Sequence, residues 1–281
     1  MLKISTSDME EIQIDVDLTP PAVYLDYCVI ADLATEPNDL GQQFREALDG
    51  ANGTLYLSWA HIIELFSLGQ GPTFERIAQY LDAFGPRFVL IDSDPNTVVE
   101  REKEWMLGRQ NPAFDEDFLR LLAANWDGQT AISFEIFVNV VRKETEFFAK
   151  IKKLHSENKT KLKELFDHKR IRYRNDRNAK KLLDGALYPR IPPGASTHKI
   201  QMELMRECVR TNEVFNASDG MDLFHAVVAL SYCDYVVLDK KWARRCRKIA
   251  LPEGAATVFD GTEVETLIKV VKSFHSNPKT S

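Results

Sequence analysis

Four carboxylate residues stand where an α/β protein could build a catalytic site. Asp26 closes the apolar run VYLD, and Asp239 closes the apolar run YVVLD. Both runs are typical of buried parallel strands, and open α/β sheets build their sites at the carboxyl ends of such strands. Glu64 lies in a predicted helix directly after a third run, TLYLS, and Asp222 lies in the first turn of the apolar helix DLFHAVVAL. The four acids are therefore expected to converge on one crevice.

Such a cluster of acids predicts a metal site. Carboxylates held close together repel one another, so four of them need a compensating cation. Oxygen-only ligands favour Mg²⁺ or Mn²⁺ over zinc or copper. One or two such ions polarise a phosphodiester and lower the pKa of an attacking water, which indicates hydrolysis of a phosphate ester. The predicted metal ligands and catalytic residues are Asp26, Glu64, Asp222 and Asp239.

Each acid also has an ordinary structural explanation. Asp26 and Asp239 could each cap the helix that follows, a role worth about 1 kcal/mol. Asp222 fits the first turn of a helix, where a negative charge interacts favourably with the helix dipole. Glu64 could lie on a solvated helix face. Four coincidences at the same edge of one sheet are less plausible than any single one, and this favours a shared site.

Three further residues are secondary candidates for the same pocket. Ser58 ends the TLYLS run, His225 follows Asp222 by three residues on one helix face, and Asp234 precedes the YVVLD strand. His225 could orient a carboxylate or contact a phosphate, or it could be a buried histidine with a structural role. Asp234 could be a fifth acid of the pocket, although turn chemistry explains it better.

The alternation of apolar runs and amphipathic segments predicts the fold class. Helices separate most of these runs, and this order predicts an α/β three-layer sandwich with a largely parallel central sheet. The sequence contains no glycine-rich dinucleotide motif and no P-loop, so neither kind of nucleotide site is supported. Strands are expected at 12–18, 23–26, 54–58, 88–92, 235–239 and 256–260.

A basic, helical segment interrupts the predicted core. From Arg142 to Arg190 the chain has 16 Lys and Arg against 7 Asp and Glu, a net charge of +9. The rest of the chain has 20 Lys and Arg against 35 Asp and Glu, a net charge of −15. This asymmetry suggests a polyanionic partner. The predicted organisation is an N-terminal extension at 1–21, a first core part at 22–107, a helical insertion at 108–199 and a second core part at 200–281.

The sharpest excess of positive charge lies in the stretch HKRIRYRNDRNAKK. Its basic side chains offer contacts to phosphates, and its aromatic ring can stack on a base. A solvated, mixed-charge helix is the structural alternative for the segment before it. We predict contact with nucleic acid for Lys169, Arg170, Arg172, Tyr173, Arg174, Arg177, Lys180 and Lys181.

These motifs resemble those of the PIN-domain nucleases, a family of metal-dependent ribonucleases with a parallel sheet and an acidic pocket. The most specific part of the resemblance is the single run DLFHAVVALSYCDYVVLDKKW. The resemblance implies a PIN-like fold, an Mg²⁺- or Mn²⁺-dependent endonuclease activity and RNA as the substrate. Its four motifs are the strand that ends in Asp26, the segment SWAHIIE with Ser58 and Glu64, the helix opened by Asp222, and VVLDKKW with Asp239.

Departures from the family pattern keep other functions open. The family commonly has small polar residues where this chain has Tyr27-Cys28 and Val237-Leu238. A catalytically degenerate PIN-like protein that binds nucleic acid or acts as a scaffold is therefore an alternative. So is a phosphatase or nucleotide hydrolase, although Asp26 lacks the second Asp of a DxD motif. A toxin or defence effector restrained by an inhibitory protein partner, and a homodimer, are also compatible with the sequence.

The remaining features predict a cytoplasmic protein without membrane association. No apolar run has the length of a membrane span, and the acidic N-terminus does not resemble a signal peptide. The four cysteines are scattered, without a CxxC pair or a histidine at zinc spacing. They are expected to be reduced packing residues.

Overall fold

The computed structural model describes residues 2–6, 12–16, 19–105, 113–126, 132–184 and 196–274. Two short strands, β1 (Leu2–Thr6) and β2 (Ile12–Val16), form an antiparallel pair. The predicted strand at 12–18 is therefore present, and β1 is its unforeseen partner. The central sheet contains β3 (Ala22–Leu25), β4 (Thr54–Leu57), β5 (Phe88–Leu90), β6 (Tyr235–Leu238) and β7 (Thr257–Asp260).

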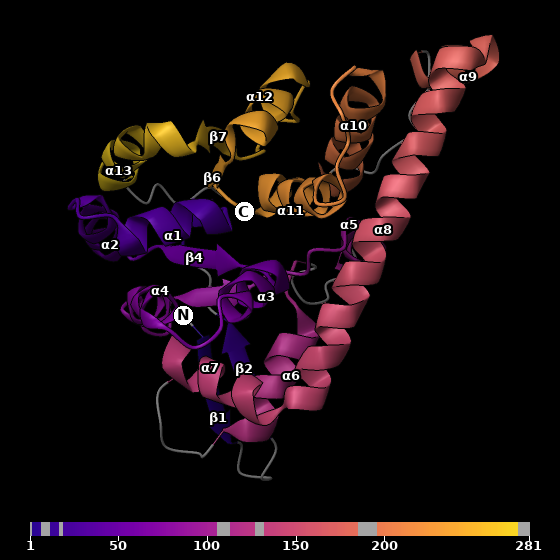
Figure 1. Cartoon of the computed structure of the whole chain (residues 1–281). Coiled ribbons are helices and arrows are strands. Elements are labelled where there is room, and N and C mark those ends of the chain that lie inside the picture. Colours follow the sequence, from indigo (N-terminus) through magenta and orange to yellow (C-terminus); the bar gives the residue numbers. More distant parts are fainter. Residues whose placement is uncertain are drawn as a thin grey trace.

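Helices pack around this central sheet (Figure 1). The first five are α1 (Tyr27–Thr35), α2 (Leu40–Gly50), α3 (Trp59–Ser67), α4 (Pro72–Asp82) and α5 (Pro95–Trp105). The next four are α6 (Glu116–Asn125), α7 (Phe134–Lys143), α8 (Thr145–Asn175) and α9 (Arg177–Asp184). The last are α10 (Ser196–Arg210), α11 (Asp219–Tyr232), α12 (Lys240–Lys248), the 3-10 turn η1 (Gly261–Glu263) and α13 (Val264–Lys272).

The five central strands are all parallel and lie in the order β5-β4-β3-β6-β7. Along the chain, β3, β4 and β5 follow one another toward one side of the sheet, and β6 and β7 then lie on the other side of β3. The order therefore reverses between β3 and β6, and a crevice forms beyond the carboxyl ends of the strands at such a point. The predicted α/β class and parallel central sheet are confirmed.

Alternate residues of β3 face two separate hydrophobic cores. Val23 and Leu25 pack in the first core, with α1, α2, α4, α7 and α13. Ala22 and Tyr24 pack in the second core, with α10, α11 and α12. All four side chains are buried, which explains why β3 is apolar throughout and does not alternate with polar residues. Helices on both faces of one sheet are compatible with the predicted three-layer sandwich.

The region predicted as an insertion is rich in helix, and its first part belongs to the main core. Phe118 of α6 and Phe134 and Phe137 of α7 are fully buried. The ring of Phe134 lies 5.5 Å from that of Phe88 in β5, measured between centroids. The predicted boundary near residue 108 lies outside the described residues.

The helices α7 and α8 are separated at Glu144, which adopts φ −86° and ψ 53°. From Thr145, α8 continues for 31 residues and contains the first part of the basic stretch, whose remainder lies mostly in α9. It runs along one side of the molecule to α9 (Figure 1) and contacts α11, α10 and α3 on the way. No helix of the described ranges is both long and apolar enough to cross a membrane.

Candidate functional site

Asp26 and Asp239 lie side by side at the carboxyl ends of two adjacent strands. Asp26 follows β3, Asp239 follows β6, and the backbone N–H of Asp26 donates to the carbonyl of Val237 at 2.8 Å. Both residues also cap helices, since Asp26 Oδ1 accepts from Tyr27 N at 2.8 Å and Asp239 Oδ1 accepts from Trp242 N at 2.7 Å. These cap hydrogen bonds fix the orientation of each carboxylate, so the structural and functional explanations are compatible.

Asp222 reaches the same place from the first turn of α11. Its Oδ2 accepts a hydrogen bond of 3.3 Å from the indole N–H of Trp242. The backbone N–H of that tryptophan is the donor to Asp239. Trp242 therefore connects two of the four acids, and its ring is almost completely buried. The sequence motif VVLDKKW contains this tryptophan, but nothing in its spacing reveals the contact with Asp222.

Glu64 is placed by α3, the helix that follows β4. The pKa of Glu64 is raised to about 7, mainly by burial and also by the negative charge of Asp26, while the positive charge of Lys159 opposes this shift. Lys159 belongs to α8, so the predicted insertion contributes a side chain to the surroundings of the site. In the sequence Lys159 is one of many basic residues in this segment. Helical spacing alone does not show which face of α8 packs against the core, so its place near the site could not be predicted.

Mutual repulsion joins the four acids into one electrostatic unit. Burial, together with the charges of Asp26, Asp219 and Asp239, raises the pKa of Asp222 to about 7. Burial followed by the charge of Asp239 likewise raises the pKa of Asp26. Within the described ranges, however, no three His, Cys, Asp or Glu side chains converge closely enough to hold one ion as they stand. The donor chemistry fits a hard divalent cation, and the side chains would have to draw together around it.

His61 links the two elements that carry Asp26 and Glu64. Its Nε2 lies 2.7 Å from the carbonyl oxygen of Leu25, which can only accept, so the proton is on Nε2. Its Nδ1 accepts from the backbone N–H of Ser58 at 3.0 Å and lies 2.9 Å from Ser58 Oγ. Burial lowers the pKa of His61 to about 4, which keeps the ring neutral. Ser58 is completely buried against this ring, which makes it a positioning residue.

Replacing His61 by Ala is expected to lower the free energy of unfolding by about 3 kcal/mol. The change leaves a cavity and removes the partners of a buried carbonyl and a buried N–H. Replacing His61 by Gln should cost less, because Gln at this helix position can still accept from the N-cap backbone in a capping box. Urea denaturation followed by circular dichroism measures both variants. Equal stability of His61→Ala and the wild type would contradict the linking role.

The structure separates the two other secondary candidates. His225 is 7% exposed, and its Nε2 has no hydrogen-bond partner among the described residues. Asp234 lies at the amino end of β6, where its Oδ2 accepts from Ala22 N at 2.8 Å and its backbone N–H donates to the carbonyl of Ala22. This is the edge of the sheet opposite to Asp26. The idea that Asp234 is a fifth acid of the pocket is therefore corrected: its carboxylate joins the start of β3 to the start of β6.

The predicted nucleic-acid contacts fall mostly on exposed faces of α8 and α9. Arg170 is the exception, because its side chain is buried and its Nη2 donates to the carbonyls of Thr211, at 2.6 Å, and Glu213. It anchors the loop between α10 and α11 and is not offered to a substrate. Tyr173 is half-buried, with its hydroxyl 3.3 Å from Asp184 Oδ1. The exposed residues of the set are Lys169, Arg172, Arg174, Arg177, Lys180 and Lys181.

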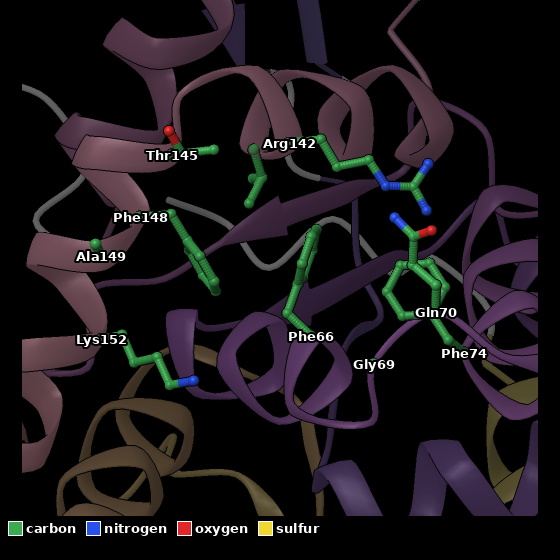
Figure 2. Close-up of a pocket in the computed structure, with 10 residues that line it drawn as sticks. Phe66, Gly69, Gln70, Phe74, Arg142, Thr145, Phe148, Ala149 and Lys152 are labelled. Carbon is green, nitrogen blue, oxygen red and sulfur yellow. The ribbon is translucent and has the colours of Figure 1, made fainter.

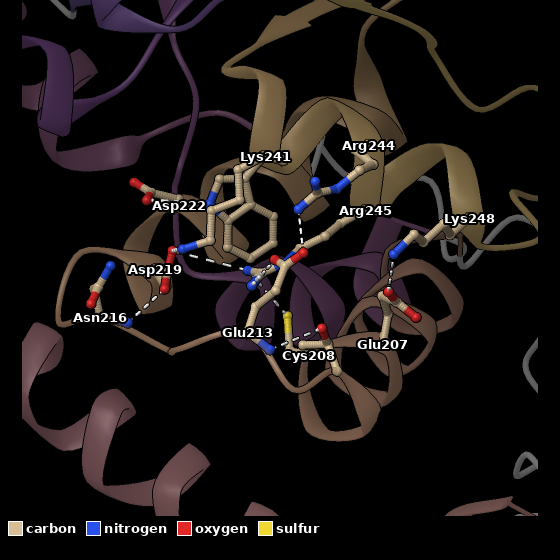
Figure 3. A network of polar contacts seen from close by, with 12 residues as sticks. Glu207, Cys208, Glu213, Asn216, Asp219, Asp222, Lys241, Arg244, Arg245 and Lys248 are labelled. Atoms are coloured by element: carbon tan, nitrogen blue, oxygen red, sulfur yellow. Dashed lines mark hydrogen bonds and ion pairs between the residues drawn. The ribbon is translucent and has the colours of Figure 1, made fainter.

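A buried ion-pair network holds the first turn of α11 against α12 (Figure 3). Asp219, 2% exposed, pairs with Lys241, and its Oδ1 lies 4.0 Å from Nη1 of Arg245. Its Oδ2 accepts from Asn216 N at 2.6 Å. Arg245 also pairs with Glu213, at 3.2 Å between Nη2 and Oε2. Because Asp222 lies one turn beyond Asp219, this network fixes the turn that carries the third acid.

An apolar pocket of about 360 Å³ lies elsewhere, between the end of α3 and the start of α8 (Figure 2). Phe66, Phe74 and Phe148 line it, with Arg142 and Lys152 at its rim. The guanidinium carbon of Arg142 lies 5.2 Å from the centroid of the Phe74 ring. None of the four predicted acids lines this pocket, so it is distinct from the carboxylate site.

The chain is an α/β protein whose acids Asp26 and Asp239 follow adjacent strands at the point where the order of a five-stranded parallel sheet reverses. Comparison of the sequence with protein-family models, with curated proteins and with solved structures gives no match. The argument for function therefore comes from the site itself.

Proposed function

We propose that the chain is a divalent-metal-dependent endonuclease with a PIN-like fold, which hydrolyses phosphodiester bonds in RNA. The observation that supports this most is the position of Asp26 and Asp239 at the carboxyl ends of adjacent parallel strands, where the strand order reverses. Asp222 and Glu64 add two more charges, and each of these two carboxyls has a pKa raised in part by Asp26. Carboxylates that repel one another in this way match the ligands of Mg²⁺ or Mn²⁺.

The residues divide the work of hydrolysis between them. Asp26, Glu64, Asp222 and Asp239 would hold the ion, and Trp242 and His61 keep the elements that carry them in place. When bound, a divalent cation stabilises negative charge on the phosphate oxygens and lowers the pKa of water. Water adds to phosphorus, the bond from phosphorus to the leaving oxygen breaks, and one carboxylate accepts the proton that water loses. The RNA strand would be held by the exposed residues of the predicted contact set, which are Lys169, Arg172, Arg174, Arg177, Lys180 and Lys181.

A second candidate is a PIN-like protein that binds nucleic acid without cutting it. Two observations favour it. The acids of the described ranges do not converge into a ligand shell as they stand. Beside Asp26, the Sγ of Cys28 lies 3.8 Å from Oδ2, where a small polar group would support an ion better. An inhibitory protein partner and a homodimer stay predictions under either function.

The deciding experiment measures cleavage and binding together. Labelled single-stranded RNA, and DNA of the same sequence, are incubated with the protein in Mn²⁺, in Mg²⁺ and in EDTA. We expect metal-dependent cleavage of RNA, and a rate at least about a thousandfold lower for Asp26→Asn. Asp234→Asn is the matched control, because it removes a carboxylate at the opposite sheet edge and keeps a side-chain acceptor. Binding that EDTA leaves unchanged, without any cleavage, would establish the second candidate instead.

A further inference from the structure

The helix α8 is pressed closely onto the beginning of α11, next to the acidic crevice. Gly220, in the first turn of α11, is the point of contact: a Cβ built on this glycine would lie 2.6 Å from Cβ of Leu162. Only a glycine permits this approach. One turn further along, the rings of Phe166 and Phe215 stack with centroids 4.3 Å apart. These two contacts fix which residues of α8 lie over the site.

Three nitrogen-bearing side chains come from the two helices that pack together here. His155 and Lys159 are four residues apart and share one face of α8, and His225 lies on α11. Burial is the main cause that lowers the pKa values of both histidines, the positive charge of Lys159 adds to it, and the same charge acts on Glu64. The junction therefore borders the carboxylate cluster on the side of Glu64.

These nitrogens lack partners among the described residues. Nε2 of His155 and Nε2 of His225 are both buried and have no hydrogen-bond partner among the described residues. Lys159 is half-buried, and the described part of the chain gives it no ion pair. A buried polar atom without a partner is costly, so native proteins rarely keep one unless a water or a ligand satisfies it. Two imidazoles and an ammonium can together donate to an acceptor that carries negative charge.

The chemistry of the junction selects an anion. A cation is disfavoured by the ammonium of Lys159, and no group of three potential metal ligands is found in the described ranges. An apolar ligand would leave both imidazole nitrogens unsatisfied. A phosphate has several strong acceptor oxygens and carries charge, which matches the three donors.

We propose that His155, Lys159 and His225 form a phosphate-binding subsite, which holds a backbone phosphate of a single-stranded nucleic acid beside the carboxylate cluster. This inference rests on the proposed function for the identity of the ligand. The subsite assigns α8 a direct role: its position over α11 brings phosphate binding and the acids into one crevice.

The test compares two neighbouring lysines of the same helix. In EDTA, where no cleavage occurs, the affinity for a labelled single-stranded RNA of 20 nucleotides is measured for Lys159→Met and for Lys161→Met. Lys161 is 71% exposed and faces solvent. We expect Lys159→Met to weaken binding about tenfold and to reduce the slope of log affinity against log salt by about 0.7, the value for one lost contact on a single strand. Lys161→Met should change the affinity less than twofold, and Lys159→Arg should restore it.

Equal affinities for Lys159→Met and Lys161→Met would overturn the subsite. A second measurement needs no variant: titration of the intact protein with inorganic phosphate, followed by the nitrogen resonances of His155 and His225. Saturable shifts of both rings support the subsite, and unchanged rings oppose it. The subsite and the nuclease can fail separately. If Lys159→Met weakens binding but the wild type shows no metal-dependent cleavage, the subsite is kept and the nuclease is rejected. If the wild type cleaves RNA but Lys159→Met binds as tightly as Lys161→Met, the nuclease is kept and the subsite is rejected.

Discussion

Replacing Asp222 by Asn is expected to abolish RNA cleavage and, at pH 8 without metal, to make the protein more stable. The loss of a ligand should lower the cleavage rate at least about a thousandfold. The gain in stability follows from burial and from repulsion. Burial, and then the charges of Asp26, Asp219 and Asp239, raise the pKa of Asp222 to about 7, so its ionised form destabilises the folded state.

The direction of the pH dependence follows from linkage. An unfolded aspartate loses its proton near pH 4, whereas folded Asp222 keeps it until about pH 7. Between these values the folded state binds more protons, so the free energy of unfolding of the wild type falls as pH rises. Asp222→Asn removes this contribution, which leaves the variant about 2 kcal/mol more stable above pH 7. This figure is smaller than the full shift implies, because Asp222 keeps some contact with solvent.

Denaturation curves from pH 4 to pH 8, with and without Mn²⁺, measure this effect. The wild type should gain about 2.7 kcal/mol when the metal is present at a hundred times its dissociation constant, and Asp222→Asn should gain much less. Asp234→Asn is the control and should respond to metal as the wild type does. Parallel pH profiles for the wild type and Asp222→Asn would contradict the shared acidic site, even if cleavage were lost.

Replacing Arg245 by Ala is expected to destabilise the protein by about 4 kcal/mol, whereas Arg244→Ala should cost less than about 1 kcal/mol. The two arginines are neighbours and share Glu213 as a partner. They differ in burial, since the Arg245 side chain is 1% exposed and that of Arg244 is 56% exposed. Removing the buried Arg245 leaves a cavity and takes one of two cations away from Asp219, which keeps Lys241, whereas an exposed pair contributes little.

Thermal unfolding of both variants tests this difference. For a chain of this size the loss at Arg245 corresponds to a melting temperature lower by about 10 °C. The consequence should reach the site as well, because the guanidinium of Arg245 lies 4.8 Å from the ring of Trp242, which is the donor to Asp222. Similar melting temperatures for Arg244→Ala and Arg245→Ala would show that burial does not set the strength of this network.

The sequence predicted the sheet and its acids for a clear physical reason. Short apolar runs of four or five residues between turns are typical of strands buried on both faces, and an Asp directly after such a run is placed at the sheet edge by the backbone alone. The positions of Asp26 and Asp239 therefore follow without any knowledge of packing. Glu64 and Asp222 were predicted as members of the site because each lies close to a strand end or a helix start.

Contacts between distant elements could not be predicted in the same way. The bond from His61 to Leu25 and the contact of Leu162 with Gly220 depend on how helices pack on the sheet. Arg170 shows the same limit. Its position in a basic run suggested that it is exposed. Instead, its guanidinium donates hydrogen bonds to carbonyls in a loop more than 40 residues further along the chain. The periodicity of apolar residues identifies which face of a helix is buried. Which element packs on that face is known only from the three-dimensional structure.

The order of the four acids along the chain determines when the site can form during synthesis. Asp26 and Glu64 precede α8 in the chain, whereas Asp222 and Asp239 follow it. A growing polypeptide thus carries half of the carboxylates through the synthesis of about 150 further residues before the others emerge and β6 can pair with β3. The four acids can therefore meet only after β6 has been made. A nascent chain that has not reached β6 lacks half of the proposed site.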